Sequence, residues 1–258
     1  MEILSCENVA FKYIESTDYA ISDCTFSVKK GEKIMLCGAS GSGKSTLLRL
    51  LKRELSPRGE LSGNITLMGK DRSELSDRES AEKIGFVMQS PDSQTVCDKV
   101  SAELAFGLES FGVKSGEIQS RVGEMAAFFG IEPLYDRDIS TLSGGQKQLV
   151  ALCSVMATDP DILLLDEPTA QLDPVAAREL LGILDRLNKE MGVTIIIAEH
   201  DPEELFDSCD KILYLAKGKT EFFGTPALTA KYFVENALEG FLPETAKAFA
   251  RLCDDLPL

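Results

Sequence analysis

A glycine-rich run that ends in lysine and serine is the part of this sequence whose residue types most directly specify chemistry. Residues 38–45 read GASGSGKS and fit the pattern G-x-x-x-x-G-K-[ST]. Glycines let successive backbone N–H groups curl around a phosphate, the lysine reaches the β- and γ-phosphate oxygens, and the final serine is placed to bind Mg²⁺. We therefore predict a site for a nucleotide and Mg²⁺. Its expected residues are Gly38, Ser40, Gly41, Gly43, Lys44, Ser45 and Thr46.

A second candidate element is an apolar run that ends in two acids, ILLLDE at residues 162–167. Such a run is typical of a parallel strand buried on both faces, and α/β sheets bind ligands at the carboxyl ends of these strands. Asp166 is therefore suited to hold Mg²⁺ directly or through water, and Glu167 to orient and polarise an attacking water. Alone, the two acids would often be a solvated strand end, but beside a phosphate-binding loop the catalytic interpretation is favoured.

The elements that must position these residues are predicted from hydrophobic periodicity. Strand-like segments cover residues 3–13, 25–28, 33–37, 64–68, 161–165 and 194–198, and residues 212–215 with 220–223 resemble a hairpin. Between about residues 90 and 160, apolar residues recur at i, i+3, i+4 and i+7, which indicates helices. Asp173 and Pro174 begin a further helix whose inner face carries Leu180, Leu184, Leu187 and Met191. Strands that alternate with helices in this way predict an α/β sheet.

Composition limits the possible partners. The 258 residues are 44% hydrophobic, which is enough to bury a core, and the formal net charge is -15. Because nucleic-acid binding depends on Lys and Arg contacts to phosphates, DNA or RNA is disfavoured as the main partner. The seven cysteines are scattered and never form C-x-x-C, so we expect reduced and mostly buried thiols. No secretory signal is visible, and no apolar run approaches the ~20 residues of a membrane-spanning helix.

The run LSGGQ at residues 142–146 indicates which family of phosphate-binding loops is present. Here the sequence resembles the nucleotide-binding subunits of ABC transporters, over nearly all of residues 1–225. The resemblance implies an α/β fold, with a P-loop NTPase (RecA-like) core, an N-terminal antiparallel β subdomain and an inserted α-helical subdomain. We expect the core at residues 1–89 and 161–225 and the helical subdomain at 90–160. Residues 226–258 are expected to form a C-terminal helical appendix of unknown purpose.

The resemblance also implies roles for individual residues. ATP would lie between two ATPase subunits, with Lys44 of one subunit and the Ser143 turn of the other on its phosphates. Tyr13 would stack on adenine, although a strand tyrosine by itself is more often a packing residue. Gln89 would contact Mg²⁺ and the attacking water, and His200 would touch the γ-phosphate. The expected catalytic residues are Lys44, Gln89, Glu167 and His200, the metal ligands Ser45, Gln89 and Asp166, and the residues at the subunit seam Ser143, Gly144, Gly145, Gln146 and Asp173.

A closer resemblance is to the ATPases of energy-coupling factor transporters, which import vitamins or transition-metal ions in prokaryotes. It rests on VMQSPDSQ at residues 87–94 and LAFG at 104–107. Two positions depart from that group, since Leu149 stands where an arginine is usual and Ser90 replaces a common asparagine. The resemblance implies peripheral attachment to the cytoplasmic face of the membrane, through an integral-membrane scaffold that works with a substrate-binding membrane protein. Glu103 would receive an arginine of that scaffold, although it would equally fit a solvated helix carboxylate.

Two other functional classes fit the sequence less well. A soluble ABC ATPase that acts on nucleic acid or ribosomes would carry a long coiled-coil insertion or a second cassette with basic linkers, and neither is visible. A nucleotide sensor without catalysis is disfavoured because Glu167 and His200 are both present. The transported solute, and whether the second ATPase subunit is identical, related or fused, stay open.

Overall fold

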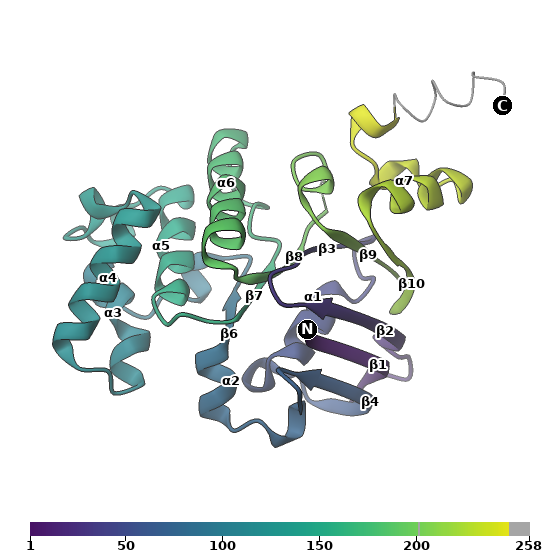
Figure 1. The fold of residues 1–258 in the computed structure, drawn as a ribbon, viewed down its shortest axis with the longest axis horizontal. Coiled ribbons are helices and arrows are strands. Elements are labelled where there is room, and N and C mark those ends of the chain that lie inside the picture. The colour runs from purple at the N-terminus through teal and green to yellow at the C-terminus, as the bar shows by residue number, and fades with distance from the viewer. Residues whose placement is uncertain (201, 248–258) are drawn as a thin grey trace.

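The structure is a computed structural model that describes residues 1–200 and 202–247. Within these residues the strands form two sheets (Figure 1). The larger sheet has the order β10-β9-β3-β8-β7-β6, in which β10 is antiparallel to β9 and the other neighbours are parallel. Its strands are β3 (Lys33–Cys37), β6 (Ile84–Val87), β7 (Ile162–Asp166), β8 (Thr194–Ala198), β9 (Lys211–Ala216) and β10 (Lys219–Gly224).

The smaller sheet is antiparallel and has the order β2-β1-β4-β5. Its strands are β1 (Glu2–Tyr13), β2 (Ile21–Lys29), β4 (Gly59–Leu67) and β5 (Lys70–Asp71). Figure 1 shows it on the opposite side of α1 from the bundle of α3, α4 and α5. The helices are α1 (Lys44–Leu51), α2 (Asp77–Lys83), α3 (Val100–Ser110), α4 (Ser115–Phe129), α5 (Gly144–Met156), α6 (Pro174–Met191) and α7 (Pro226–Glu235).

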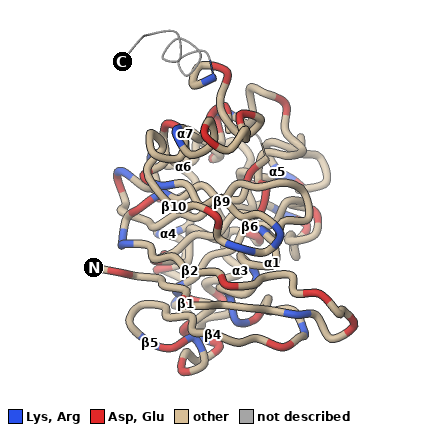
Figure 2. The backbone as a smooth tube through the Cα atoms, turned by 90° about the vertical axis from the view of Figure 1, so that its right-hand side faces the viewer, with Lys and Arg blue, Asp and Glu red and all other residues tan. Residues whose placement is uncertain are grey.

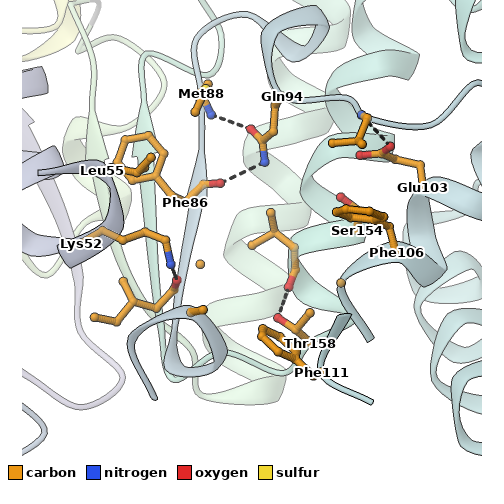
Figure 3. A pocket seen from close by; sticks show the side chains of 16 residues that line it. Lys52, Leu55, Phe86, Met88, Gln94, Glu103, Phe106, Phe111, Ser154 and Thr158 are labelled. Carbon is orange, nitrogen blue, oxygen red and sulfur yellow. Dashed lines mark hydrogen bonds between the residues drawn. The ribbon is translucent and has the colours of Figure 1, made fainter. Parts of the chain in front are cut away.

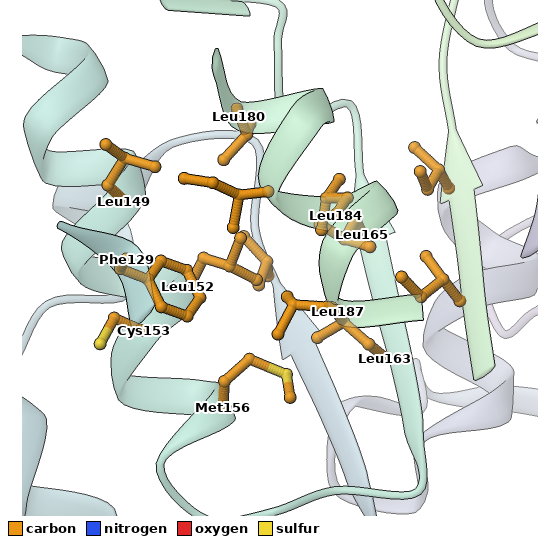
Figure 4. Packing of buried hydrophobic residues seen from close by; sticks show 14 of the residues in the cluster. Phe129, Leu149, Leu152, Cys153, Met156, Leu163, Leu165, Leu180, Leu184 and Leu187 are labelled. Carbon is orange, nitrogen blue, oxygen red and sulfur yellow. The ribbon is translucent and has the colours of Figure 1, made fainter. Parts of the chain in front are cut away.

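Two hydrophobic cores lie on the two faces of the larger sheet. Successive side chains of a strand point to opposite faces, so the central strands feed both cores. Ile34 and Leu164 belong to the core shared with α1 and the smaller sheet, whereas Met35 and Leu165 belong to the core shared with α5 and α6. Figure 4 shows the second core, where β7, α5 and α6 meet through Leu163, Leu165, Leu152, Met156, Leu184 and Leu187. This packing fixes the carboxyl ends of the strands, which carry the candidate site.

Most of the predicted apolar faces are confirmed. Leu149, Leu152, Cys153 and Met156 are buried on α5, and Leu180, Leu184 and Leu187 are buried on α6. Met191 was assigned wrongly to the inner face, because it is the last residue of α6 and is 38% exposed where the chain turns at Gly192. Of the cysteines within the described residues, Cys97 is half-buried and the other five are buried. Cys253 lies outside them.

Several strands differ from the expected ranges. β2 begins at Ile21 and β4 at Gly59, both earlier than predicted, and β6 and α2 were not predicted. The first six residues of β4 are exposed, so their hydrophobicity carries no strand signal; they form a strand because their backbone pairs with β1. β6 is too short to show a period.

The segment after residue 225 is joined to the sheet by aromatic side chains. Tyr214 of β9 meets Phe233 of α7 edge to face at 5.1 Å, and Phe222 of β10 stacks on Tyr232 at 4.6 Å between ring centroids. The predicted appendix therefore starts with a helix that packs on β9 and β10. Its residues 248–258 lie outside the described part.

Asp and Glu residues are spread over the length of the molecule, with Lys and Arg residues scattered among them (Figure 2). None of the helices in the described part of the chain has both the length and the apolar character needed to span a bilayer.

Candidate functional site

The turn between β3 and α1 has the shape of an anion-binding loop. Gly43 is the N-cap of α1 and has a φ of 104°. Because glycine has no side chain, it provides no acceptor for the first backbone N–H groups of the helix. A Cβ atom at Gly43 would lie 2.7 Å from the backbone oxygen of Ala20, so both conformation and space require glycine there. Free N–H groups and the positive end of the helix dipole favour a bound phosphate.

A cavity of about 300 Å³ opens beside this loop. It brings together the end of β1, the phosphate-binding loop and the residues that follow β7 and β8. Its lining residues are Tyr13, Ala20, Ser40, Gly41, Gly43, Lys44, Ser45, Thr46, Glu167 and His200. Most of the residues that the sequence assigned to the nucleotide therefore line one cavity, although they come from distant parts of the chain.

Lys44 is buried and folded back on its own loop. Its Nζ donates to the backbone oxygens of Gly38 at 2.8 Å and Ala39 at 3.3 Å. Burial lowers the pKa of Lys44, and the nearby carboxylate of Glu167 partly opposes that effect. The ammonium group thus lies beside the cavity with weak neutral acceptors, which phosphate oxygens can replace.

Ser45 lines the cavity and forms an oxygen-rich pair with Asp166, which lies just outside the lining. Ser45 Oγ donates to Asp166 Oδ1 at 2.7 Å, and Asp166 is buried at the end of β7. Among the described residues, no group of three or more His, Cys, Asp or Glu side chains could hold a metal ion by itself. The oxygens of Ser45 and Asp166 fit Mg²⁺, which prefers oxygen ligands and is usually held by one or two protein groups together with substrate phosphates.

Glu167 is held at both carboxylate oxygens. His200 Nε2 lies 2.7 Å from its Oε1, and Gln89 Nε2 donates to its Oε2 at 3.1 Å. Glu167 also has a φ of 49°, a left-handed conformation that costs a non-glycine residue about 1–3 kcal/mol and recurs at functional sites. The three side chains meet because β6, β7 and β8 are neighbours, so that the residues following them share one edge of the sheet.

Tyr13 is half-buried on the wall of the cavity rather than in the core. Its hydroxyl forms a 2.9 Å hydrogen bond with Thr46 Oγ1, and its ring meets Phe11 edge to face at 5.0 Å. These contacts fix the ring, which suits it to stack on a base.

The residues expected at the subunit seam do not line this cavity. Ser143 caps α5, accepting from Gln146 N at 3.3 Å while its own N–H donates to Gln146 Oε1 at 3.1 Å. Asp173 caps α6, with Oδ1 accepting from the N–H groups of Val175 and Ala176. Ser143, Gly144 and Asp173 are exposed, while Gly145 and Gln146 are half-buried. Within one chain their visible role is to start helices.

Sequence reasoning missed Glu199, which is 4% exposed directly after β8. Its Oε1 accepts from both the backbone N–H of Thr169 at 3.0 Å and Thr169 Oγ1 at 2.7 Å. Burial raises the pKa of Glu199. The signal was available, since Glu199 follows a buried apolar strand just as Asp166 ends one.

Comparisons with known proteins agree on one family. Residues 21–170 match the family model described as ABC transporter. A protein of Pyrococcus abyssi named as an ABC transporter ATP-binding protein is 39% identical over 228 residues, which cover 88% of this chain and 81% of that protein. One of Bacillus thuringiensis with the same description is 42% identical over 94% of this chain, but this chain spans only 44% of its length.

Solved structures point the same way. CbiO1 of Clostridium perfringens, part of the ABC transporter complex CbiONQ, has a TM-score of 0.82 at 32% identity and covers 96% of this chain and 99% of its own. A dimeric ATP-binding cassette in a post-hydrolysis state, bound to ADP and Pi, has a TM-score of 0.74 at 27% identity, covering 86% and 98%. The predicted α/β fold, with its antiparallel β subdomain and helical parts, is confirmed, and the chain belongs to the ABC transporter family.

Proposed function

We propose that this chain is the ATP-binding and ATP-hydrolysing subunit of an ABC transporter. The observation that carries the proposal is the carboxylate of Glu167, which is held between Gln89 and His200 at the edge of a cavity whose other side is the phosphate-binding loop. A protein that hydrolyses ATP needs a group that orients water beside the γ-phosphate, whereas a protein that only binds the nucleotide needs no such group.

The phosphates of ATP would be bound by the backbone N–H groups of residues 38–45 and by Lys44, which exchanges its contacts with two carbonyl oxygens for phosphate oxygens. Ser45, Asp166 and Gln89 would hold Mg²⁺, which neutralises charge on the phosphates when bound. Tyr13 would stack on the base. Glu167 would then accept a hydrogen bond from the attacking water, with Gln89 and His200 fixing the direction of its two oxygens.

A second ATPase unit would complete the site. The residues expected at the subunit seam lie outside the cavity of their own chain and are mostly exposed; they are Ser143, Gly144, Gly145, Gln146 and Asp173. The resemblance to the family implies that the turn at Ser143 meets the γ-phosphate held by the opposite unit. Gly144 and Gly145 open α5, so the turn also offers a helix N-terminus to an anion. The dimeric form of the solved cassette with ADP and Pi supports this arrangement.

The transporter would be an importer of the energy-coupling factor type, for a vitamin or a transition-metal ion. Similarity to CbiO1 supports this, as does a groove of about 270 Å³ between the sheet and α3, shown in Figure 3. Gln94 braces one wall, since its side chain accepts from Met88 N and donates to Phe86 O. A membrane scaffold docked in this groove would hold the chain at the cytoplasmic face of the membrane.

Glu103 lines the same groove and is the proposed acceptor for an arginine of the scaffold. It is 5% exposed, and its Oε2 accepts from the N–H groups of Val96 and Cys97. Glu103→Gln keeps an acceptor for these N–H groups and removes only the charge. We expect weaker assembly with the scaffold for Glu103→Gln and unchanged assembly for the exposed control Glu109→Gln, measured by co-purification from detergent. Equal assembly of both variants would remove Glu103 from the interface.

Hydrolysis is tested by Glu167→Gln, which has nearly the same shape and loses the negative charge. We expect ATP to bind with an affinity within about threefold of the wild type, because phosphate contacts are unaffected, while kcat falls by at least about a hundredfold. Substantial turnover by the variant would contradict the assignment of Glu167.

A further inference from the structure

Glu199 is a buried carboxylate to which the proposed hydrolysis gives no role. It does not line the nucleotide cavity but borders a separate one of about 370 Å³, and His200 lines both cavities. Two of the donors to its side chain are on one residue, Thr169, whose N–H and hydroxyl converge on Oε1, and the backbone N–H of His200 is a further donor. A buried carboxylate is costly unless it is hydrogen-bonded, and burial raises the pKa of Glu199, so these bonds compensate an unfavourable position.

Thr169 lies in the middle of the loop that joins β7 to α6. The loop begins at Glu167 and ends at Asp173, the cap of α6. Two of its own hydrogen bonds are local turns, from Ala170 N to Glu167 O at 3.2 Å and from Leu172 N to Thr169 O at 3.0 Å. Local turns give the loop a shape but do not attach it to the sheet.

The attachment to the sheet comes from the end of β8. Glu167 N donates to Ala198 O at 2.9 Å, His200 contacts the Glu167 carboxylate, and Glu199 accepts from Thr169. Residues 198 and 200 thus bind Glu167, and residue 199 between them binds Thr169. Of these three contacts, only that of Glu199 reaches beyond Glu167, toward residues 171–173, of which Gln171 and Asp173 are exposed.

We propose that Glu199 is a positioning residue for ATP hydrolysis, which acts by fixing the loop of residues 167–173 against the end of β8. It rests on the proposed function, since it assigns Glu199 to the support of Glu167 and His200. Both Thr169 donors need only an acceptor oxygen, so the amide oxygen of a glutamine serves as well as a carboxylate. An alanine provides no acceptor and leaves both donors unpaired.

The first test is hydrogen exchange on the whole chain without nucleotide, so that it does not depend on activity. In Glu199→Ala we expect the amide of Thr169 to exchange at least about tenfold faster than in the wild type, because its acceptor is gone. Glu199→Gln should exchange within about threefold of the wild type. Amides of β3 should be unchanged in both variants, which separates loss of this contact from general destabilisation.

The second test is kinetic. Glu199→Ala should lower kcat about tenfold while the Kd for ATP changes by less than about twofold, because Glu199 lies outside the nucleotide cavity. Glu199→Gln should restore kcat. Thr169→Val removes the hydroxyl but keeps the backbone N–H, so its loss of kcat should be smaller than that of Glu199→Ala. The double variant Glu199→Ala, Thr169→Val should have the same kcat as Glu199→Ala alone, because both changes remove the same contact. If Glu199→Ala does not fold, Thr169→Val decides, with Thr169→Ser restoring activity.

The inference is overturned if exchange at the Thr169 amide is the same in Glu199→Ala and the wild type, or if kcat of Glu199→Gln is as low as that of Glu199→Ala. It is also overturned if the losses of kcat in Glu199→Ala and Thr169→Val add in the double variant. A wild-type chain that shows the expected exchange pattern and hydrolyses no ATP, alone or with its partners, would instead refute the proposed function. The two failures are therefore distinguishable.

Discussion

Replacement of His200 by alanine probes how much the fixed orientation of Glu167 contributes to hydrolysis. His200 Nε2 lies 2.7 Å from Glu167 Oε1, while Gln89 holds the other oxygen at 3.1 Å. A hydrogen bond to a charged group contributes about 1.5–3 kcal/mol. Because 44% of the His200 side chain is exposed, water weakens the bond and the lower figure applies. A difference of about 1.4 kcal/mol is tenfold in rate, so we expect kcat of His200→Ala to fall roughly tenfold.

The assay is steady-state ATP hydrolysis of the assembled ATPase together with a separate titration of ATP binding. The phosphate-binding loop and Tyr13 are untouched in His200→Ala, so the Kd for ATP should change by less than about threefold. Gln89→Ala is measured in parallel, because it frees the other oxygen of the same carboxylate, and its own loss also includes the expected contact of Gln89 with Mg²⁺. The double variant should lose less than the sum of the two, since both bonds orient one group.

The reasoning would be refuted if His200→Ala kept more than about half of the wild-type kcat. It would also be refuted if the variant lost activity only through weaker ATP binding, because His200 would then act on the nucleotide and not through Glu167.

Three further outcomes are expected. Asp173→Ala removes the cap of α6 and should lower the free energy of unfolding by about 1 kcal/mol in urea titration, whereas the neighbouring exposed Gln171→Ala should change it by less than about 0.5 kcal/mol. Gly43→Ala should weaken ATP binding by more than about tenfold in a binding titration, because the new Cβ meets Ala20 O at 2.7 Å; wild-type affinity would contradict this view of the loop. Burial raises the pKa of Cys153 to about 12, so its reactive thiolate is scarce at pH 8 and increases only as the pH rises toward that value. Peptide mapping after alkylation of the native protein at pH 8 should therefore find Cys153 unmodified, and rapid labelling there would show that the core opens.

The fold was predictable where hydrophobicity has a clear period and unpredictable where it does not. The buried strands β3, β7 and β8 stand out because four of the five residues in each are apolar, and the inner faces of α5 and α6 because apolar residues recur every third and fourth position. The six exposed residues at the start of β4 and the four residues of β6 do not, because backbone pairing with β1 and β7 defines them.

The chemical groups of the candidate site are a property of the sequence by itself. The phosphate-binding loop is one continuous run of residues, and Asp166 and Glu167 are adjacent in the sequence. Residue type and spacing therefore already specify what each of these two segments can bind. Their assembly was decided only by the tertiary structure. Because the larger sheet orders its strands β3-β8-β7-β6, residues 78 positions apart in the chain, Gln89 and Glu167, form a hydrogen bond. The same sheet order gives the buried Glu199 its partner Thr169, since the residues that follow β7 and β8 are neighbours in space.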